Sequence, residues 1–226
     1  MVKLCYVVWS VDATPRRFAR RLLDEEAPRL LASGARRLTV DVADVAVTGG
    51  PVMPRPRPEG SVAALVSVWL DAAQDRGPVE AILGRAGTKL AGYLVTESIP
   101  RDFDHRTWAD GERTPGIKQV TFFDKLPGMA DDAFIRQWHG SHTPLSLEVH
   151  PLWRYVRNVV ERPLTDGAPR WLGIVEETFR EVEDFTDPQR MYGSVDNMRR
   201  VLADVRKFID LETIEVYVMS EYTVRS

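Results

Sequence analysis

The chain has 226 residues, of which 44% are hydrophobic and 28% are charged, and its formal net charge is −3 at pH 7. These values are typical of one large soluble domain or two small ones. The slight negative charge excludes a general nucleic-acid binder, which needs a basic face. No apolar stretch reaches the roughly 20 residues that a membrane span requires, and the N-terminus shows no signal-peptide pattern. We therefore expect no membrane partner and a cytoplasmic location.

The hydrophobic pattern predicts the order strand, helix, strand, strand, helix, strand twice. In the first half these elements are expected at residues 2–9, 15–32, 37–42, 63–70, 78–85 and 90–97. A Pro/Gly-rich loop is expected at residues 49–58. After a polar linker the order returns at residues 119–123, 130–143, 154–160, 171–179, 195–208 and 214–222.

Two alignments of the chain with itself support an internal duplication. Residues 93–97 resemble residues 217–221. A shift of 116 positions aligns four residues of the first predicted helix, Phe18, Leu22, Glu26 and Pro28, with Phe134, Trp138, His142 and Pro144. We therefore predict an α+β fold of two tandem ferredoxin-like βαββαβ units, with residues 1–99 as a degenerate repeat, residues 100–116 as a linker and residues 117–226 as the second unit.

A four-stranded sheet with both helices on one face leaves its other face bare, and an apolar bare face must be covered. Two tandem units can cover each other, so we expect a pseudo-dimeric α/β barrel within one chain. Such a barrel needs no second chain, which leaves the outer surfaces for a homodimer. A small ligand is expected in the enclosed volume or between a sheet and its first helix.

Residues 134–144 combine two histidines with an aromatic helix face. Phe134, Trp138 and His142 are spaced four apart and share one face of a helix. Histidine is the side chain whose ordinary pKa lies nearest neutral pH, so His142 is the predicted general acid or base. Pro144 is expected to end the helix, which would place His142 near free carbonyls that favour a protonated ring. The alternative is a structural histidine that hydrogen-bonds a carbonyl.

The predicted substrate-binding residues combine aromatic rings with polar groups, and they are Trp138, His139, Tyr155, Asn158 and Tyr217. The tyrosines can stack on an aromatic ligand and donate a hydrogen bond, although packing alone would also explain them. Tyr155 and Asn158 are three apart on one strand and point to opposite faces. His139, His142 and His150 lack a recognised zinc spacing, so no metal site is predicted.

Residues 117–226 resemble an EthD-type domain of the dimeric α/β-barrel superfamily. The resemblance rests on Phe134-x-x-x-Trp138-x-x-x-His142-x-Pro144, on Tyr155-Val-Arg-Asn158 and on residues 173–176. It implies a compact, often cofactor-free protein that acts on hydrophobic small molecules, as cyclases, isomerases, decarboxylases and cofactor-independent monooxygenases do. Some members of the superfamily bind haem. Because Leu22 and Glu26 replace the tryptophan and the histidine in the first half, the resemblance implies one intact site per chain.

These observations predict a cofactor-independent proton-transfer enzyme of the lyase, isomerase or cyclase class. Its partner would be a hydrophobic carbonyl or phenolic compound. His142 would move a proton alpha to a carbonyl, and Tyr155 would orient the substrate or stabilise an enolate. One alternative is a non-catalytic small-molecule binding protein. Another is a haem-binding barrel with His142 or His150 as the axial ligand.

Overall fold

The computed structural model describes residues 1–11, 14–45, 47, 50–51, 53–55 and 57–226. Its strands are β1 (Val2–Ser10), β2 (Arg37–Val42), β3 (Ser61–Leu70), β4 (Lys89–Arg101), β5 (Ile117–Phe123), β6 (Leu152–Pro163), β7 (Gly173–Phe179) and β8 (Glu215–Arg225). They form one closed barrel in the order β1-β3-β2-β8-β5-β7-β6-β4. The predicted α+β class and the barrel within one chain are therefore confirmed.

The two halves of the chain contribute equivalent parts of this barrel. The first half supplies four neighbouring strands in the order β4-β1-β3-β2, and the second half supplies β8-β5-β7-β6. Antiparallel pairing of β2 with β8 and of β4 with β6 joins the halves at two seams. The barrel therefore has no free strand edge, and neither half closes it alone.

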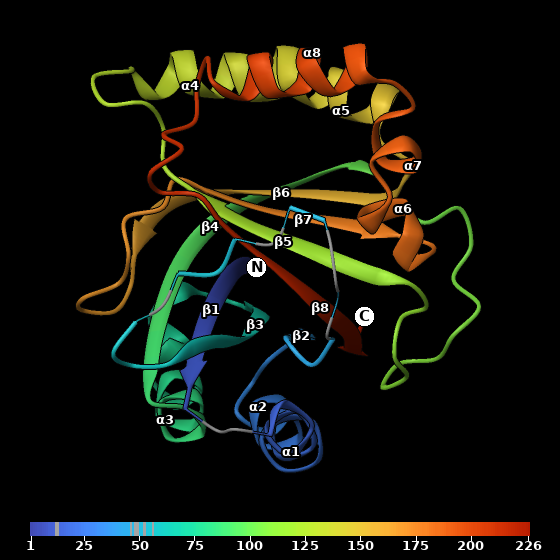
Figure 1. Cartoon of the computed structure of the whole chain (residues 1–226). Coiled ribbons are helices and arrows are strands. Elements are labelled where there is room, and N and C mark those ends of the chain that lie inside the picture. The colour runs from blue at the N-terminus through green and yellow to red at the C-terminus, as the bar shows by residue number, and fades with distance from the viewer. Residues whose placement is uncertain (12–13, 46, 48–49, 52, 56) are drawn as a thin grey trace.

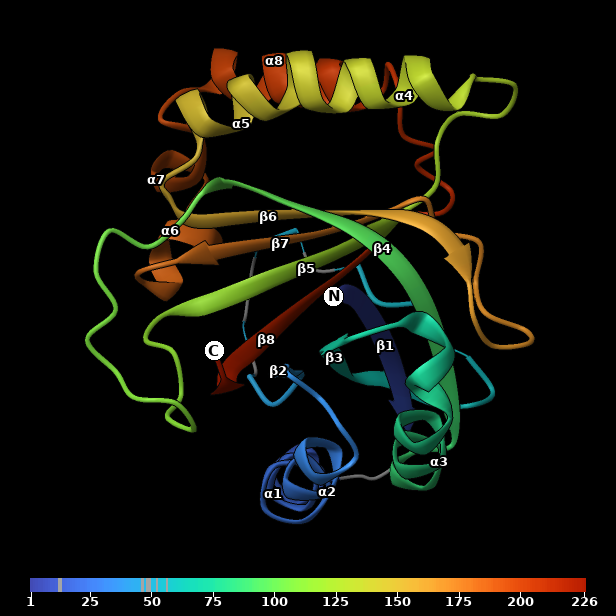
Figure 2. The same ribbon diagram turned by 180° about the vertical axis from the view of Figure 1, so that it is seen from behind.

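Helices cover the barrel on two opposite sides (Figures 1 and 2). The helical elements of the first half are α1 (Pro15–Arg21), η1 (Leu22–Glu26), α2 (Ala27–Ala32), η2 (Ala73–Arg76) and α3 (Gly77–Ala86). Those of the second half are α4 (Asp131–Gln137), η3 (Trp138–His142), α5 (Thr143–Val149), α6 (Val182–Thr186), α7 (Pro188–Tyr192) and α8 (Val195–Val205). Among the described residues, none of these helices is long and apolar enough to cross a membrane.

The expectation that Pro144 ends the helix is wrong. The helix passes through the π-helical turn η3 and continues as α5 to Val149. A proline inside a regular α-helix clashes with the carbonyl of the preceding turn, and the wider π-helical turn before Pro144 relieves this clash. The first half has the same arrangement, because η1 precedes Pro28. The two π-helical turns coincide at the shift of 116 positions.

Side chains alternate along each strand between the barrel interior and a helix layer. On β1, Val7 and Trp9 point inward, whereas Leu4 and Tyr6 pack under the first-half helices. One part of the interior is aromatic, because the Phe122 ring stacks on Trp171 with centroids 4.4 Å apart. The pocket-facing residues of β5, β6 and β7 belong to the other surface of the sheet.

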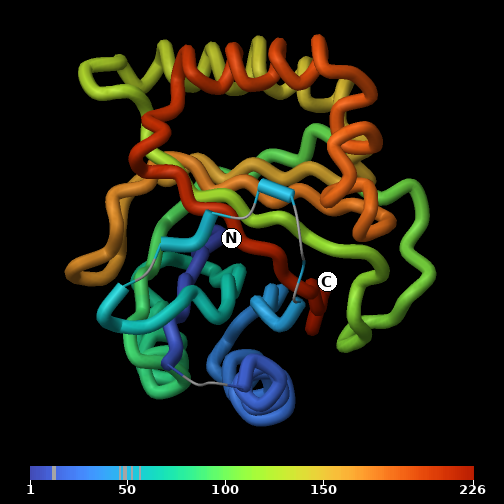
Figure 3. Tube along the Cα trace, viewed as in Figure 1, coloured from blue at the N-terminus to red at the C-terminus, as the bar shows by residue number. Residues whose placement is uncertain are grey.

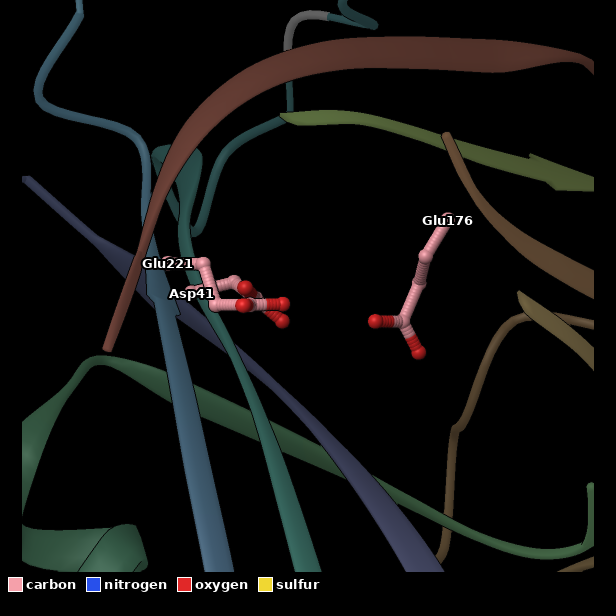
Figure 4. Close-up of side chains that lie close together, drawn as sticks. All are labelled: Asp41, Glu176 and Glu221. Carbon is pink, nitrogen blue, oxygen red and sulfur yellow. The ribbon is translucent and has the colours of Figure 1, made fainter. Parts of the chain in front are cut away.

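Another part of the barrel interior is charged. Lys118 is 1% exposed, and its ammonium lies 2.8 Å from Asp41 Oδ1 and 2.7 Å from Glu176 Oε2, with Glu221 as a third partner. Figure 4 shows Asp41 and Glu221 side by side, with Glu176 facing them across the space between. Burial alone would lower the pKa of Lys118, but the three carboxylates outweigh it and raise that pKa. The cluster is therefore a buried ion-pair network with its own cation.

Candidate active site

A pocket lies between the second-half sheet and the helices that cover it. Its volume is about 150 Å³, comparable to a cavity that takes up benzene. Polar groups line it from the sheet and from the helices: Gln119, Thr121, His142, Ser146, His150, Tyr155, Glu177 and Tyr192. Apolar and aromatic residues form much of the remaining wall: Pro51, Met53, Phe123, Trp138, Val175, Met191, Val201, Leu202, Ile209, Ile214 and Val216. The pocket therefore suits a hydrophobic molecule of about one ring.

His142 enters this pocket from the last position of η3. Its Nδ1 lies 3.1 Å from Asp204 Oδ2, and its Nε2 lies 3.3 Å from the hydroxyl of Ser146. Burial lowers the pKa of His142 below its ordinary value, and the Asp204 carboxylate opposes this only in part. The ring is therefore neutral at pH 7. With Asp204 ionised, Nδ1 carries the proton and Nε2 is an acceptor.

Asp204 holds this ring in place from α8. Ser194 caps the N-terminus of this helix, because its hydroxyl accepts a hydrogen bond from the N–H of Asn197. Asp204 lies in the final turn of the helix. Burial alone would raise the pKa of Asp204, but hydrogen bonds from Lys207 and His142 hold it below its ordinary value. The sequence analysis missed Asp204. The sequence feature that could have identified Asp204 is a carboxylate on an apolar helix face, three residues after Val201.

Trp138 and Tyr155 line the same pocket, as the predicted substrate-binding role requires. The indole N–H of Trp138 donates to the Tyr155 hydroxyl over 3.4 Å, and the Trp138 ring packs edge-on against Phe123. Burial raises the pKa of Tyr155, so its hydroxyl stays protonated at neutral pH. Both residues are deeply buried, so they form the inner wall of the pocket rather than its opening.

Glu177 is a pocket residue that the sequence analysis did not single out. It stands on β7 directly between Tyr155 on β6 and Gln119 on β5. The Gln119 amide donates to its Oε2 over 2.5 Å. Burial raises the pKa of Glu177 to about 7. The pocket thus contains a second titratable group on the wall formed by the sheet.

The two remaining histidines of this region differ in their relation to the pocket. His150 lines it, and its Nδ1 donates to the carbonyl of Met191 over 3.0 Å. His139 does not line it and instead packs its ring against Trp138. Burial lowers the pKa of both rings to about 4. Neither ring carries a proton charge at neutral pH.

Asn158 and Tyr217 lie inside the barrel, on the other surface of the sheet. Asn158 is fully buried and donates to Glu176 over 2.9 Å. The Tyr217 hydroxyl donates to Glu215 over 2.8 Å, and its ring packs against Phe122. The structure thus brings together His142, Trp138 and Tyr155 but separates Asn158 and Tyr217 from them.

The first half reaches across to close this pocket. Of the loop expected at residues 49–58, residues 49, 52 and 56 lie outside the described residues. Within the described part, Met53 forms two backbone hydrogen bonds of 3.1 Å with Val216 on β8, and Figure 3 shows this segment beside the second-half strands. Pro51 and Met53 line the pocket. One wall of the second-half pocket therefore comes from the first half.

The equivalent position in the first half has a different chemistry. Leu22 is fully buried in the apolar core under the first-half helices. Glu26 is buried and pairs with Arg29 over 3.0 Å. Phe18 and Leu30 pack in the same core. Among the described residues of this half, no histidine occupies the position that corresponds to His142.

The described residues do not fit haem, which the resemblance raised. A neutral imidazole such as His142 or His150 is suitable chemistry for an axial ligand, but a pocket of about 150 Å³ is far too small for the macrocycle. Asp41, Glu176 and Glu221 are the described residues whose spacing could hold a metal ion. The Lys118 ammonium occupies the space between these three carboxylates, and that space lies away from the pocket.

The fold and the pocket together define an α+β protein with a closed eight-stranded barrel whose two halves lie in one chain. Residues 126–212, less than half of the chain, match the family model of the EthD domain. The matched segment includes Trp138, His142, Glu177 and Asp204. The sequence matches no curated protein at a significant level.

Solved structures share the fold over almost the whole chain, at identities that show the fold alone. An anthrone oxidase-like protein is 13% identical with a TM-score of 0.60, covering 99% of this chain and 92% of that protein. A proposed monooxygenase from Fusobacterium nucleatum subsp. nucleatum is 9% identical with a TM-score of 0.54, covering 99% and 93%. A DyP-type peroxidase from Cellulomonas bogoriensis is 13% identical with a TM-score of 0.52, covering 100% and 90%.

Proposed function

We propose that this protein is a cofactor-independent proton-transfer enzyme for a hydrophobic carbonyl or phenolic compound of about one ring. The observation that carries the proposal is the neutral His142 ring, fixed by Asp204, in a mostly apolar pocket. A neutral imidazole with one nitrogen held and the other available is suited to general-base catalysis. The pocket volume supports the size of the substrate.

In the proposed reaction His142 Nε2 removes a proton from carbon alpha to the carbonyl, or from a phenol. Asp204 keeps the proton on Nδ1 and stabilises the imidazolium that forms. Trp138 supplies a flat apolar wall for the ring of the substrate, and the Tyr155 hydroxyl orients it. Ser146, 3.3 Å from Nε2, holds that nitrogen until the substrate displaces the contact.

We also infer that the chain consists of two tandem ferredoxin-like units, with boundaries at residues 1–99 and 117–226. The shared strand order of the two halves supports this inference. The coincidence of η1 with η3 at the shift of 116 positions supports it independently. In this interpretation the first unit has replaced its histidine by Glu26 and now closes the pocket of the second.

A second candidate function is oxidation of the deprotonated substrate by dioxygen. It is favoured by the names of two proteins with the same fold, an anthrone oxidase-like protein and a proposed monooxygenase. Both functions begin with the same deprotonation by His142. Uptake of dioxygen in step with substrate consumption, followed with an oxygen electrode, would distinguish oxidation from tautomerisation or cyclisation.

The test uses cyclohexanone as a one-ring carbonyl probe in deuterated water, with loss of its alpha protons followed by NMR. His142→Asn is expected to reduce the exchange rate by about 10²–10⁴-fold, the usual contribution of a general base. His139→Asn is the matched control, because His139 adjoins Trp138 but does not line the pocket. In the wild type the rate should rise with pH only up to the lowered pKa of His142. Equal rates for wild type and His142→Asn would contradict the proposal.

A further inference from the structure

We propose that Glu177 is a second acid–base group of this pocket, which protonates the oxygen of the substrate while His142 removes a proton from carbon. The inference rests on the proposed function and makes it more specific. It assigns the reaction to tautomerisation of an enolisable ketone of about one ring. The substrate's oxygen would face β7 and its acidic carbon would face η3.

The two neighbouring glutamates of β7 have opposite surroundings. Glu176 points into the barrel, where Lys118 lies 2.7 Å and Lys3 3.4 Å from its carboxylate oxygens. Glu177 points into the pocket, and among the described residues no cation pairs with it. A buried carboxylate without a cation is costly, so such a group is favoured in its neutral form. A neutral carboxylic acid carries a proton that it can donate.

The neighbours of Glu177 leave one of its oxygens for a ligand. Gln119 donates to Oε2 over 2.5 Å, and Gln119 in turn donates to the Thr121 hydroxyl over 3.0 Å. Oε1 has no hydrogen-bond partner among the described residues. Since Glu177 is 8% exposed and lines the pocket, Oε1 is the atom available to a bound molecule.

The groups around Glu177 are neutral at pH 7. The titratable ones are Tyr155 on β6, Tyr192 on α7, His142 in η3 and His150 after α5. Burial raises the pKa of Tyr155 and of Tyr192, and it lowers the pKa of both histidines. Burial raises the pKa of Glu177 itself to about 7, so its acid form is abundant near and below neutral pH.

The proposed cycle balances without an oxidant or a further reactant. The C–H bond alpha to the carbonyl breaks, its proton goes to His142 Nε2, and its electron pair forms the C=C bond of an enolate. The Glu177 proton moves to the enolate oxygen and completes the enol. After the enol leaves, the imidazolium loses its proton to water and the Glu177 carboxylate gains one. The net reaction is keto to enol, and its reverse uses the same two groups.

The test compares the pH dependence of cyclohexanone deuterium exchange in wild type, Glu177→Gln and Glu177→Leu. The wild-type rate should rise through the His142 pKa and fall above about pH 7 as Glu177 ionises. Glu177→Gln keeps a neutral donor, so its alkaline decline should disappear while the acid limb stays. Glu177→Leu has no donor and should lose about 10²-fold or more, the usual effect of deleting such a donor. Glu148→Gln, on the exposed face of α5, is the control.

An infrared measurement tests the same assignment without activity. Near pH 6 the difference spectrum of wild type minus Glu177→Gln should show a carboxylic acid band of Glu177, because the buried acid form of Asp41 contributes equally to both proteins and cancels. If that band is absent, the inference about Glu177 is overturned, whatever rate of cyclohexanone exchange the protein shows. A second outcome separates the two proposals. If His142→Asn loses exchange but Glu177→Gln keeps the alkaline decline of the wild type, the role of Glu177 is overturned and the proposed function stands. If His142→Asn exchanges as fast as wild type, or wild type does not exchange at all, the proposed function and this inference fall together.

Discussion

Neighbouring side chains of one type take different charge states here because strand alternation gives them different surroundings. Burial alone would raise the pKa of Glu176, but Lys118, Lys3 and Arg154 hold it below the ordinary value. Glu177, one residue further on the other surface, meets no cation, and its pKa rises to about 7. The position of a carboxyl group relative to the sheet therefore decides whether it supports folding or chemistry.

Lys118→Met is expected to destabilise the protein by about 3–5 kcal/mol at pH 7, because it leaves three buried carboxylates without their shared cation. In the wild type the pKa values of Glu176 and Glu221 are lowered, so the stability they contribute is lost as pH falls through those values. In the variant the carboxylates repel each other and gain from protonation. The difference between the proteins should therefore narrow between pH 7 and pH 5.

Urea unfolding at both pH values measures this difference. Arg136→Met serves as the control, since Arg136 and Asp132 form an exposed ion pair on α4, and removal of such a pair should leave stability almost unchanged. A Lys118→Met protein as stable as the control at pH 7 would contradict the role given to the buried ammonium.

The sequence predicted part of the site at the level of single residues. His142 and Trp138 were found because a spacing of four marks one helix face, a local property. Asp204 is 62 residues from His142, and only the packing of α8 on η3 joins them. Glu177 was missed because β7 is buried on both surfaces, so its pattern does not show which glutamate meets the cations. Asn158 and Tyr217 were grouped with the pocket because the sequence leaves open which surface each strand residue faces.

At the scale of elements, two glycines differ in the space that surrounds them. A Cβ added to Gly84 on α3 would meet nothing within 4 Å, whereas one added to Gly92 on β4 would lie 2.5 Å from Tyr6 Cε1. Gly84→Ala should stabilise the protein by about 0.5–1 kcal/mol, since alanine is favoured in a helix interior. Gly92→Ala should destabilise it by about 1–3 kcal/mol through overpacking. Thermal or urea unfolding of the pair tests both signs, and equal stabilities would contradict this packing.

The predicted order of strands and long helices is confirmed because each of them is either an apolar run of strand length or a segment with a regular apolar face. The pattern did not predict α6 and α7, which have five residues each and are too short to show a period. They matter to the site, since α7 carries Met191 and Tyr192 into the pocket wall. The π-helical turns were missed for a related reason: they add a residue to a turn without interrupting the apolar face.

At the scale of the molecule, the two seams make the barrel one structure. Residues 117–226 alone would expose the edges of β6 and β8 together with their half of the barrel interior. Exposed edges of this kind pair with other chains, so the isolated second half should dimerise or aggregate. Size-exclusion chromatography with light scattering measures this, with the full chain as reference. A stable monomer of the isolated half would contradict the requirement for mutual cover.

Because Met53 contacts β8, the shape of the pocket and its acid–base chemistry depend on different residues. The groups that would move protons all lie in the second half, whereas Pro51 and Met53 shape the pocket from the first half. Variation in this loop can alter which molecule is accepted and leave His142, Asp204 and Glu177 untouched. A library of loop sequences, with both ends fixed by β2 and β3, is therefore a direct way to retune the choice of substrate independently of the chemistry.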